Sequence, residues 1–538
     1  MKFIYCLLGL IVGIINQASA IVNDVYDVVI YGGTSAGVIA AHQVSRMGKT
    51  VALIEKSHHL GGMTTSGLGY IDVNNAQRVG GLTQEYFHRV WRYYQNDSAW
   101  IWEAKHPMKG QYGNPWFDEE MMWVVEPHVA EQIFTDMIHA AGIHVAFGER
   151  LDRKHGVVKS GQRIVKITME SGRSFSGKMF IDATYEGDLM ALADVSYIVG
   201  REPNSRYNEI YNGLKPNFNY GHVSIDPFLV QGDPSSGLLP RVYPDLGGLK
   251  GEGDDRVQAY NYRMCLTDVP ENRILIEKPL DYDERDYEII FRAIESGENM
   301  KRFLKLSRIP NLKTDTNNHG PYSTDFIGMS WDYPEANYSE RDRIAKKHEM
   351  WQRGLIWTLQ NHPRVPPEIR ALYAPWGLAK DEFADNRHWP RELYVREARR
   401  MVSDVVITEN MALSKIPVSD SIGVATYHMD SHCIKYYVNS DHVLATDGSV
   451  FEKVPVSFYI SYGAIIPKKE ECENLLVPVC LSASHVAFGS LRTEPVLMIL
   501  GQSAATAACV AINQKVSVQD ISYAELRTRL LADDQIVK

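Results

Sequence analysis

Two histidines and an aspartate occupy alternate positions in the stretch TYHMDSHC, residues 426–433. If this stretch is a strand, His428, Asp430 and His432 lie on one face. A histidine with a pKa near neutral can take the proton of an alcohol whose carbon is being oxidised, so these histidines are candidate bases. The same trio could instead hold a metal through two imidazoles and one carboxylate, or simply be packing or surface residues. We favour the base and predict no bound metal.

His485 is a rival base, in the polar loop expected before the last long helix. Among the three histidines we slightly favour His432, because its stretch precedes the C-terminal segments and can reach a domain interface. Asp430 can orient one imidazole. Tyr462 is the next candidate if no histidine serves.

A glycine-rich loop in DVVIYGGTSAGVIAAH, residues 27–42, indicates a second kind of chemistry. Gly32 permits a tight turn, Gly37 permits close helix–strand packing, and the free N–H groups at the helix start can bind phosphate. Thr34 replaces the usual middle glycine, and its hydroxyl can donate to a phosphate oxygen. Glu55 follows Gly37 by 18 residues, where a carboxylate can accept both ribose hydroxyls. The loop predicts ADP-ribose binding, with an ordinary βαβ unit as the alternative.

The segment LGGMTTSGLG, residues 60–69, follows the second strand of this unit. Its glycines and hydroxyls suit a loop that passes beneath a pyrophosphate toward a flavin ring, which favours FAD over NAD. No second glycine motif for a nicotinamide is evident. The cofactor residues predicted from this part of the chain are Gly32, Thr34, Ser35, Ala36, Gly37, Glu55, Lys56, Gly61, Gly62, Met63 and Thr64.

Alternating strands and helices are expected to position these loops. The N-terminal unit comprises a strand over 27–31, a helix over 35–47 and a strand over 51–54. Further on, a helix is expected from Pro127 to Ala141, and 178–195 reads as a strand, a polar turn and a helix. Strands are also expected near 143–147 and 164–170, and a long small-residue helix near Thr493 and Pro495.

A helix is also predicted from Pro390, because proline suits a first helical turn. Arg396, Arg399 and Arg400 would share one face of it, with Glu392 four residues before Arg396. Such a face is expected to be a solvated set of ion pairs. The alternative is a basic face that binds FAD phosphates or an acidic substrate group.

The sequence resembles the FAD-dependent oxidoreductases of the glutathione-reductase-type superfamily, and more closely a family of bacterial FAD-dependent oxidoreductases, many with export signals. The resemblance covers most of residues 26–200 and 390–515. It rests on YGGTSAG (31–37), LGGMTTSGLG (60–69), EPHVAE (126–131), IDATYEGD (181–188), YVREARRMVSD (394–404) and ASHVAFGSLRTEPVLMILGQSAA (483–505).

The resemblance implies an α/β fold with a Rossmann-like FAD-binding domain built from separated segments. It places Thr184, Gly187 and Asp188 near the ribityl and phosphate groups, and the backbone of Leu151 at the adenine edge. Arg492 stands beside the positive N-terminus of the last long helix, and both would stabilise negative charge at the N1–C2=O edge of the flavin.

These assignments divide the chain into five segments. The first segment, residues 1–20, is predicted to be a secretory signal. Lys2, the apolar run that follows it, and Ala18-Ser19-Ala20 have the layout of a cleavable signal, so the mature protein is expected to be exported, periplasmic or secreted. The FAD-binding domain is assigned to 24–200 and 421–515, with an inserted α+β cap at 201–420 and a tail at 516–538.

Charge and cysteine content bear on the binding partners of the protein and on its disulfide pairing. The net charge of −10 is spread along the 538 residues, so no basic footprint for nucleic acid is visible, and no membrane span is expected after signal cleavage. Five cysteines remain after residue 20, so at least one thiol is unpaired within the chain.

We therefore expect an exported flavoenzyme that oxidises a small polar substrate, such as a sugar, polyol or glycoside, by hydride transfer to flavin N5. Its electron acceptor is open and includes oxygen. The alternatives are a redox-neutral FAD-dependent lyase or isomerase acting on glycans, and a non-catalytic exported glycan-binding protein.

Overall fold

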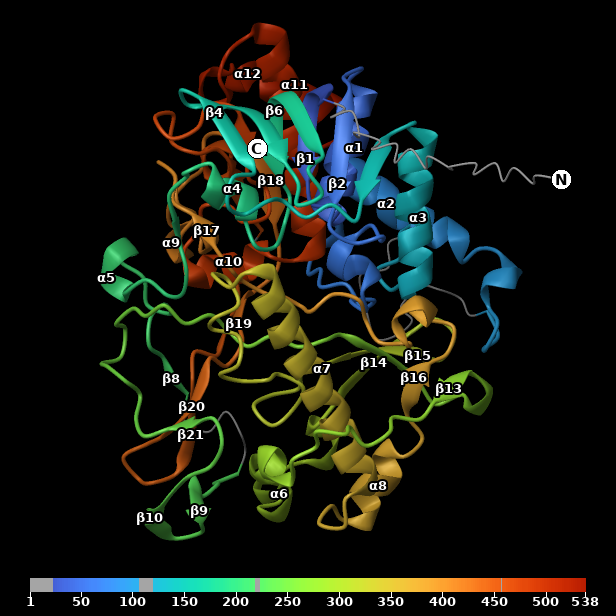
Figure 1. Ribbon diagram of the computed structural model, residues 1–538, viewed down its shortest axis with the longest axis vertical. Helices are drawn as coiled ribbons and strands as arrows, with labels where there is room; N and C mark the ends of the chain where they lie inside the picture. The colour runs from blue at the N-terminus through green and yellow to red at the C-terminus, as the bar shows by residue number, and fades with distance from the viewer. Residues whose placement is uncertain (1–22, 106–119, 218–222, 456) are drawn as a thin grey trace, which may run out of the picture.

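The computed structural model describes residues 23–105, 120–217, 223–455 and 457–538. The proposed signal sequence therefore lies outside the described residues. A large sheet with its helices forms the upper half of Figure 1, and two smaller sheets with α6, α7 and α8 form the lower half, which we call the cap.

The large sheet has the strand order β3-β2-β1-β6-β5-β4, and β24 pairs with β6. The strands β1, β2, β3, β6 and β24 run parallel, whereas β4 and β5 join by antiparallel pairing. Tyr31, at the end of β1, is in register with Ile54 and Asp182. The glycine loop, Glu55 and the segment after Asp182 therefore meet at one edge of the sheet. The strands are β1 (Asn23–Tyr31), β2 (Val51–Glu55), β3 (His144–Phe147), β4 (Val157–Ser160), β5 (Arg163–Thr168), β6 (Ser174–Asp182) and β24 (Leu475–Leu476).

Two helices that are far apart in sequence pack together beside this sheet: α1 (Ser35–Arg46) and α11 (Glu494–Gln514). A Cβ at Gly501 would collide with the carbonyl oxygen of Ala36, so glycine permits this close approach. By length and hydropathy (1.7) α11 could cross a membrane, but 94% of its apolar window is buried inside the protein, as in a core helix. The other helices of this half are α2 (Gly81–Tyr93), α3 (Pro127–Ala140), α4 (Asp188–Leu192), α9 (Glu409–Ala412), α10 (His485–Leu491) and α12 (Tyr523–Ala532).

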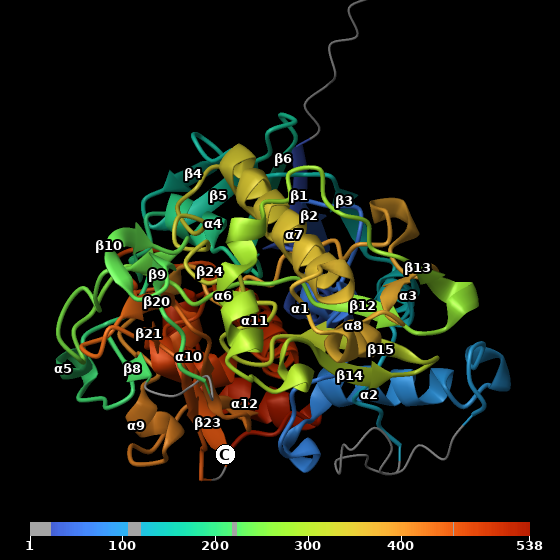
Figure 2. The same cartoon turned by 90° about the horizontal axis from the view of Figure 1, so that it is seen from below.

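The cap contains a five-stranded sheet of order β13-β16-β12-β15-β14 and a four-stranded sheet of order β11-β20-β21-β8. The 24-residue helix α7 runs from the junction of the two halves down into the cap (Figures 1 and 2). The cap strands are β8 (Pro216–Asn217), β11 (Val242–Tyr243), β12 (Met264–Thr267), β13 (Arg273–Ile274), β14 (Lys305–Ile309), β15 (Lys313–Asn317), β16 (Gly377–Ala379), β20 (Lys435–Val438) and β21 (Leu444–Asp447). The cap helices are α6 (Glu288–Glu295), α7 (Tyr338–Asn361) and α8 (Pro367–Tyr373).

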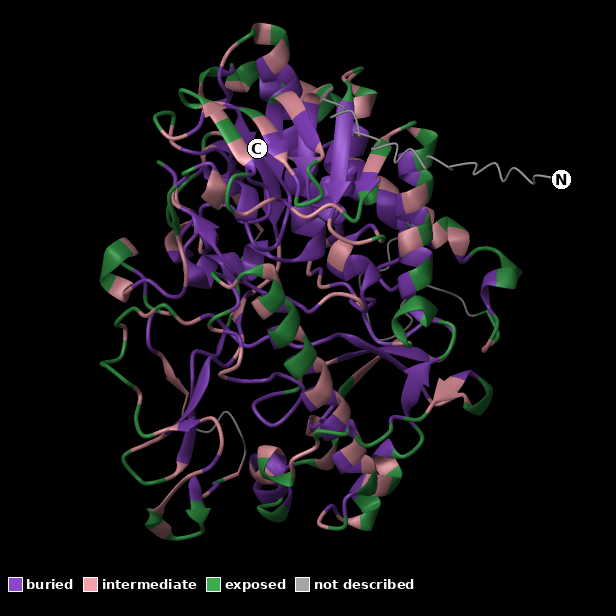
Figure 3. Ribbon diagram, in the orientation of Figure 1, coloured by how far each residue is buried: buried purple, intermediate pink, exposed green. Residues whose placement is uncertain are grey.

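The remaining elements are short. They are the helix α5 (Asn204–Tyr207) and the strand pairs β7 (Tyr197–Ile198) with β17 (Arg400–Met401), β9 (Phe228–Val230) with β10 (Asp233–Leu238), β18 (Ser421–Ala425) with β23 (Phe458–Ser461), and β19 (Met429–Ser431) with β22 (Val450–Glu452). The inner strand β2 of the large sheet is buried along its length, whereas the outer strands β3 and β4 carry exposed residues (Figure 3). Exposed residues also lie in outer loops and on outward helix faces (Figure 3).

The predicted α/β class is confirmed, and the N-terminal strands and helix lie where the sequence places them. Two local predictions are wrong. The stretch after Pro390 is not a helix but an extended segment that ends in β17, and the loop expected around His485 contains α10. The strands β20 and β21 pair within the cap, although the sequence assigns residues 421–515 to the cofactor domain.

Candidate functional site

A cavity of about 1290 Å³, counting the space at its mouth, opens at the edge where the parallel strands end. Parallel α/β sheets bind ligands at this edge because loops and helix N-termini converge there. Seven of the predicted cofactor residues line the cavity: Gly32, Thr34, Glu55, Lys56, Gly62, Thr184 and Asp188.

Glu55 lies at the end of β2 and is nearly buried. Its carboxylate accepts hydrogen bonds from the backbone N–H groups of Gly33 and Ser57, each at 2.7 Å. A carboxylate has about four acceptor positions, so two remain for ligand hydroxyls. A side chain at position 33 would lie 2.9 Å from Glu55 Oε2, which explains the second glycine of the loop. The geometry suits the predicted ribose contact.

We expect Glu55→Ala to weaken FAD binding by about 10- to 100-fold, because a hydrogen bond to a charged group contributes about 1.5–3 kcal/mol. Ultrafiltration of the purified protein, with flavin measured in the filtrate, checks this. Glu170→Ala, which removes an exposed carboxylate of the same half, is the matched control. Equal FAD retention by both variants would show that Glu55 does not hold the ribose.

The glycine loop differs from expectation at Thr34. The Thr34 hydroxyl donates to the carbonyl oxygen of Ala183 at 2.7 Å and accepts from Gly37 N–H at 3.3 Å. Its single proton is therefore used within the protein, and the predicted donation to phosphate is wrong. Phosphate would instead meet backbone N–H groups at the start of α1. Gly32, with φ +107°, and Gly37 are required because a Cβ at either position would collide with nearby backbone atoms.

Glu494, the first residue of α11, joins three of the cofactor segments. It accepts hydrogen bonds from the hydroxyls of Ser35, Thr64 and Tyr185 at 2.6–2.8 Å. Burial raises the pKa of Glu494, although the three hydroxyl hydrogen bonds oppose this shift. The hydroxyls of Ser35 and Thr64 therefore hold the loops in place. The neighbouring predicted residues Ala36, Gly61 and Met63 are buried in the same loops, and Tyr185 OH accepts from Met63 N–H at 2.9 Å.

Hydrogen bonds and ion pairs within the protein also fix the segment that follows β6. Thr184 Oγ1 donates to Asp182 at 2.6 Å and accepts from Gly187 N–H at 3.0 Å. Three guanidinium groups surround Asp188: Arg341 in a bidentate pair at 2.6 and 3.0 Å, Arg399 at 2.8 Å and Arg153 at 3.6 Å. Asp188 thus links the large sheet to the cap, a role that the sequence did not indicate.

Leu151 also differs from expectation. Its N–H donates to Tyr31 OH and its carbonyl oxygen accepts from Tyr338 OH, both at 3.0 Å. Its backbone groups are therefore already paired, and a contact to adenine would require one of these tyrosines to move.

Sequence reasoning missed the cap's contribution to this cavity. Residues from the helix α7 and from the extended segment 391–393 line it beside the cofactor loops. Lys56 bridges the halves, since its ammonium lies 3.3 Å from Glu186 and 3.2 Å from Glu392. No motif marks α7, so this could not be read from the sequence. The cap residues at the cavity are Tyr262, Tyr333, Tyr338, Arg341, Asp342, Ala345, Arg391, Glu392 and Leu393.

A second polar cluster lies at the start of α11, around His432. Its Nδ1 lies 2.5 Å from Asp325 Oδ2, and its Nε2 lies 3.6 Å from Asp430 Oδ2. Arg492, which lies two residues before Glu494 in the sequence, contacts Asp430 at 3.1 Å. Burial would raise the pKa of Asp430, but His432 and Arg492 together hold it well below its ordinary value. His432, Asp430 and Arg492 are therefore brought together as predicted, whereas Asp325, which contacts the imidazole most closely, was missed.

The rival bases are placed less favourably. His485 is almost fully buried, and its two ring nitrogens lie 2.7 Å from Glu397 and 3.1 Å from Ser431 Oγ. His428 lies near Asn74 and packs against Phe451, away from the carboxylates that hold His432. Tyr462 OH donates to the carbonyl oxygen of Val518 at 2.7 Å, so its proton is already used within the protein. Among these groups, the geometry favours His432.

The chain matches the family model described as FAD dependent oxidoreductase over residues 27–530. It belongs to this family. No curated protein matches the chain. FAD fits the residues present, since the glycines leave room for a phosphate at the start of α1 and Glu55 keeps acceptor positions free beside the cavity.

Solved flavoenzymes resemble only part of the chain. They include L-proline dehydrogenase from P. horikoshii (15% identity, 39% of this chain and 68% of that one, TM-score 0.23). Another is thioredoxin reductase from T. acidophilum (17% identity, 30% of this chain and 35% of that one, TM-score 0.18). A third is a flavin-containing monooxygenase from Stenotrophomonas maltophilia (15% identity, 34% of this chain and 43% of that one, TM-score 0.20). The chain spans less than half of the latter two, and at these scores the likeness carries no argument about activity.

In this FAD-dependent oxidoreductase, the three arginines predicted to share a solvated helix face are buried instead. Arg396 pairs with Asp325 at 3.0 Å, Arg399 with Asp188, and Arg400 with Glu202 at 2.7 Å. An extended segment points successive side chains in different directions, so each arginine reaches a different partner. Glu392 contacts Lys56 rather than Arg396, so the expected pair along a helix is absent.

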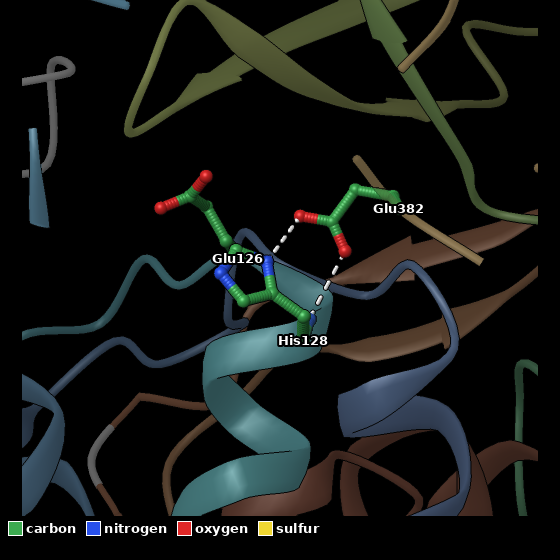
Figure 4. A group of neighbouring side chains, drawn as sticks. All are labelled: Glu126, His128 and Glu382. Carbon is green, nitrogen blue, oxygen red and sulfur yellow. Dashed lines mark hydrogen bonds and ion pairs between the residues drawn. The ribbon is translucent and has the colours of Figure 1, made fainter. Parts of the chain in front are cut away.

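A cluster of Glu126, His128 and Glu382 has the composition of a metal site. Figure 4 shows two hydrogen bonds between His128 and Glu382 and none between either residue and Glu126. The ammonium of Lys313 contacts Glu126, Asp381 and Glu382 at 2.8, 2.8 and 2.6 Å. Burial would lower the pKa of Lys313, but Glu382 and Glu126 raise it well above its ordinary value. The carboxylates therefore surround an internal cation, and the cluster joins α3 to the cap.

Proposed function

We propose that this FAD-dependent oxidoreductase oxidises a hydroxyl group of a small polar molecule, with His432 as the base that takes the hydroxyl proton. Sugars, polyols or glycosides are the substrate class we favour. The observation that carries the proposal is the His432–Asp325 pair beside the N-terminus of α11, where Glu494 also binds the cofactor loops.

The protein's own residues have distinct parts in this reaction. In the proposed mechanism Asp325 accepts from His432 Nδ1–H, an arrangement that leaves Nε2 to accept the substrate proton. The Asp430 carboxylate, 3.6 Å from Nε2, would stabilise the imidazolium that forms. Arg492 and the positive end of α11 would stabilise negative charge that develops near them. Bound FAD supplies the hydride acceptor, and oxygen or another acceptor would take up the electrons afterwards.

An anaerobic screen of sugars and polyols tests the proposal. A substrate should bleach the flavin absorbance, and the bleaching should persist at two electrons per FAD until an acceptor is added. A compound that is converted without lasting bleaching would favour a redox-neutral lyase or isomerase. A purified protein without a flavin spectrum would favour a glycan-binding protein instead.

We also propose that the enzyme is exported and that its mature N-terminus is Ile21. The support is the charged, apolar and small-residue layout of residues 1–20. N-terminal sequencing of protein recovered from the periplasm or medium should begin at Ile21. Folded cytoplasmic protein that retains Met1 would overturn the assignment.

A further inference from the structure

A ring of four charged side chains joins the two halves of the protein beside the FAD cavity. His59 follows the strand β2 and Glu131 lies on α3, both in the half that contains the large sheet. Asp385 and Arg391 belong to the chain that leaves the cap strand β16. His59 and Arg391 themselves line the FAD cavity, so the ring forms part of the wall of the cofactor site.

Each cation of this ring contacts both carboxylates. His59 places Nδ1 2.7 Å from Glu131 Oε1 and Nε2 2.9 Å from Asp385 Oδ2. The guanidinium of Arg391 lies 3.0 Å from Glu131 Oε2 and 2.6 Å from Asp385 Oδ1. Each half of the protein therefore supplies one cation and one carboxylate. The contacts His59–Asp385 and Glu131–Arg391 cross the junction between the halves.

The ring is complete only when His59 is charged. A neutral imidazole has an N–H on one nitrogen only, so its second nitrogen would turn a lone pair toward a carboxylate. The hydrogen bond to Glu131 raises the pKa of His59 above its ordinary value, and Asp385 adds to this shift, although partial burial and Arg391 oppose it. Hydrogen bonds from Arg391 lower the pKa of Asp385 to about 2, so this carboxylate stays charged at neutral pH.

The turn that carries Asp385 is strained. Phe383, Arg387 and His388 have φ values of 50°, 55° and 62°, in the left-handed region, although none of them is glycine. This conformation is unfavourable for residues with a side chain and persists where surrounding contacts impose it. The contact between Asp385 and His59 is one of these. Its loss should allow the turn to relax away from the cavity.

His59 differs from the other groups that join the halves at this cavity. The pairs Arg341–Asp188 and Arg150–Asp342 use arginines, which keep their charge. His59 is the one histidine among the described residues that line the cavity, and a histidine changes its charge near neutral pH. The junction thus contains one contact that can be switched by a proton.

We propose that the ring is a clasp that holds the cap against the FAD-binding half while His59 is protonated, and that cofactor exchange becomes faster when His59 is neutral. A raised pKa means that the folded protein favours the charged imidazole. The clasp therefore contributes fully below the ordinary histidine pKa of about 6.5, and its contribution is lost as the pH rises through the raised value.

The test measures how fast FAD leaves the loaded protein in the absence of substrate. The protein is diluted at about pH 6 and at about pH 9, on either side of the histidine range, and fluorescence measures the flavin in timed ultrafiltrates. The parent should release FAD about three- to tenfold faster at the higher pH, because partly exposed ion pairs contribute modestly. Amides of residues 383–391 should also exchange with deuterium faster at the higher pH, after correction for the intrinsic effect of pH.

Two variants remove the clasp and one leaves it intact. His59→Gln cannot become charged, so it should release FAD at both pH values at about the rate of the parent at the higher pH. Asp385→Asn weakens the ring from the cap side and should also speed release at the lower pH. His58→Gln changes the exposed neighbour of His59, which packs near Phe147 outside the ring, and should keep the pH ratio of the parent.

Equal release rates of the parent at the two pH values would overturn the inference, and so would a pH ratio in His59→Gln as large as in the parent. If His59→Gln fails to fold, the parent ratio, the exchange measurement and Asp385→Asn decide the outcome. No substrate is present, so a failed oxidation screen leaves these results unaffected and the two proposals fail independently.

Discussion

Replacing His432 with alanine should slow flavin reduction by about 10²- to 10⁴-fold while leaving FAD bound. A hydride leaves an alcohol carbon readily only if the hydroxyl proton departs with it, and we propose that His432, paired with Asp325, accepts that proton. Anaerobic stopped-flow absorbance measures the rate, with the sugar or polyol that bleaches the flavin. Asp325→Asn should cause a smaller loss, because the imidazole remains but loses the carboxylate that fixes its tautomer.

His428→Ala is the matched control, because His428 lies in the same stretch but has no carboxylate partner at ion-pair distance among the described residues. It should reduce flavin at nearly the parent rate. The assignment of the base fails if His432→Ala reduces flavin as fast as His428→Ala does.

Replacing Lys313 with methionine should lower the free energy of unfolding by about 3–5 kcal/mol, the usual cost of leaving a buried charge without its partner. The variant would leave Glu126 and Glu382 buried around an uncharged side chain. Urea denaturation of the FAD-loaded protein, followed by circular dichroism, measures the difference. Lys346→Met, which breaks an exposed pair with Glu349, should cost about 0–1 kcal/mol.

The effect of Lys313→Met should also depend on pH. Burial would raise the pKa of Glu382, but Lys313 and His128 hold it below its ordinary value in the folded protein. The stability from this pairing is therefore present above the ordinary carboxyl pKa and is lost as the pH falls. The deficit of the variant should be largest near neutral pH and shrink in acid, where protonation neutralises the glutamates. A deficit independent of pH would indicate a packing defect rather than lost charge pairing.

Local features of the site could be predicted from the sequence, and features made by distant segments could not. The glycine loop and Glu55 follow one another within a single βαβ unit, so spacing alone placed them beside one cavity. Asp325 binds His432 across 107 residues, and Arg341 reaches Asp188 across 153 residues, with no motif to link them.

The arginine segment shows how a local pattern can mislead. Arg396, Arg399 and Arg400 have helical spacing, but their partners come from three different parts of the chain. Pairing with these distant carboxylates outweighs the weak local preference for a helix, which is a small term beside tertiary contacts. The hydroxyl of Thr34 was misassigned for the same reason, since its acceptor, Ala183, lies 149 residues away.

The contacts of Glu494 have a consequence for how the protein is made. Its carboxylate binds Ser35, Thr64 and Tyr185 across 459, 430 and 309 residues, so this shared anchor of the cofactor segments forms only after nearly all of the chain has emerged from the ribosome. Closing such long loops is slow, and the unfinished chain must keep its apolar strands from aggregating meanwhile. A nascent chain that ends before residue 494 should therefore hold no flavin, and cofactor loading should be a late event that follows the completion of synthesis.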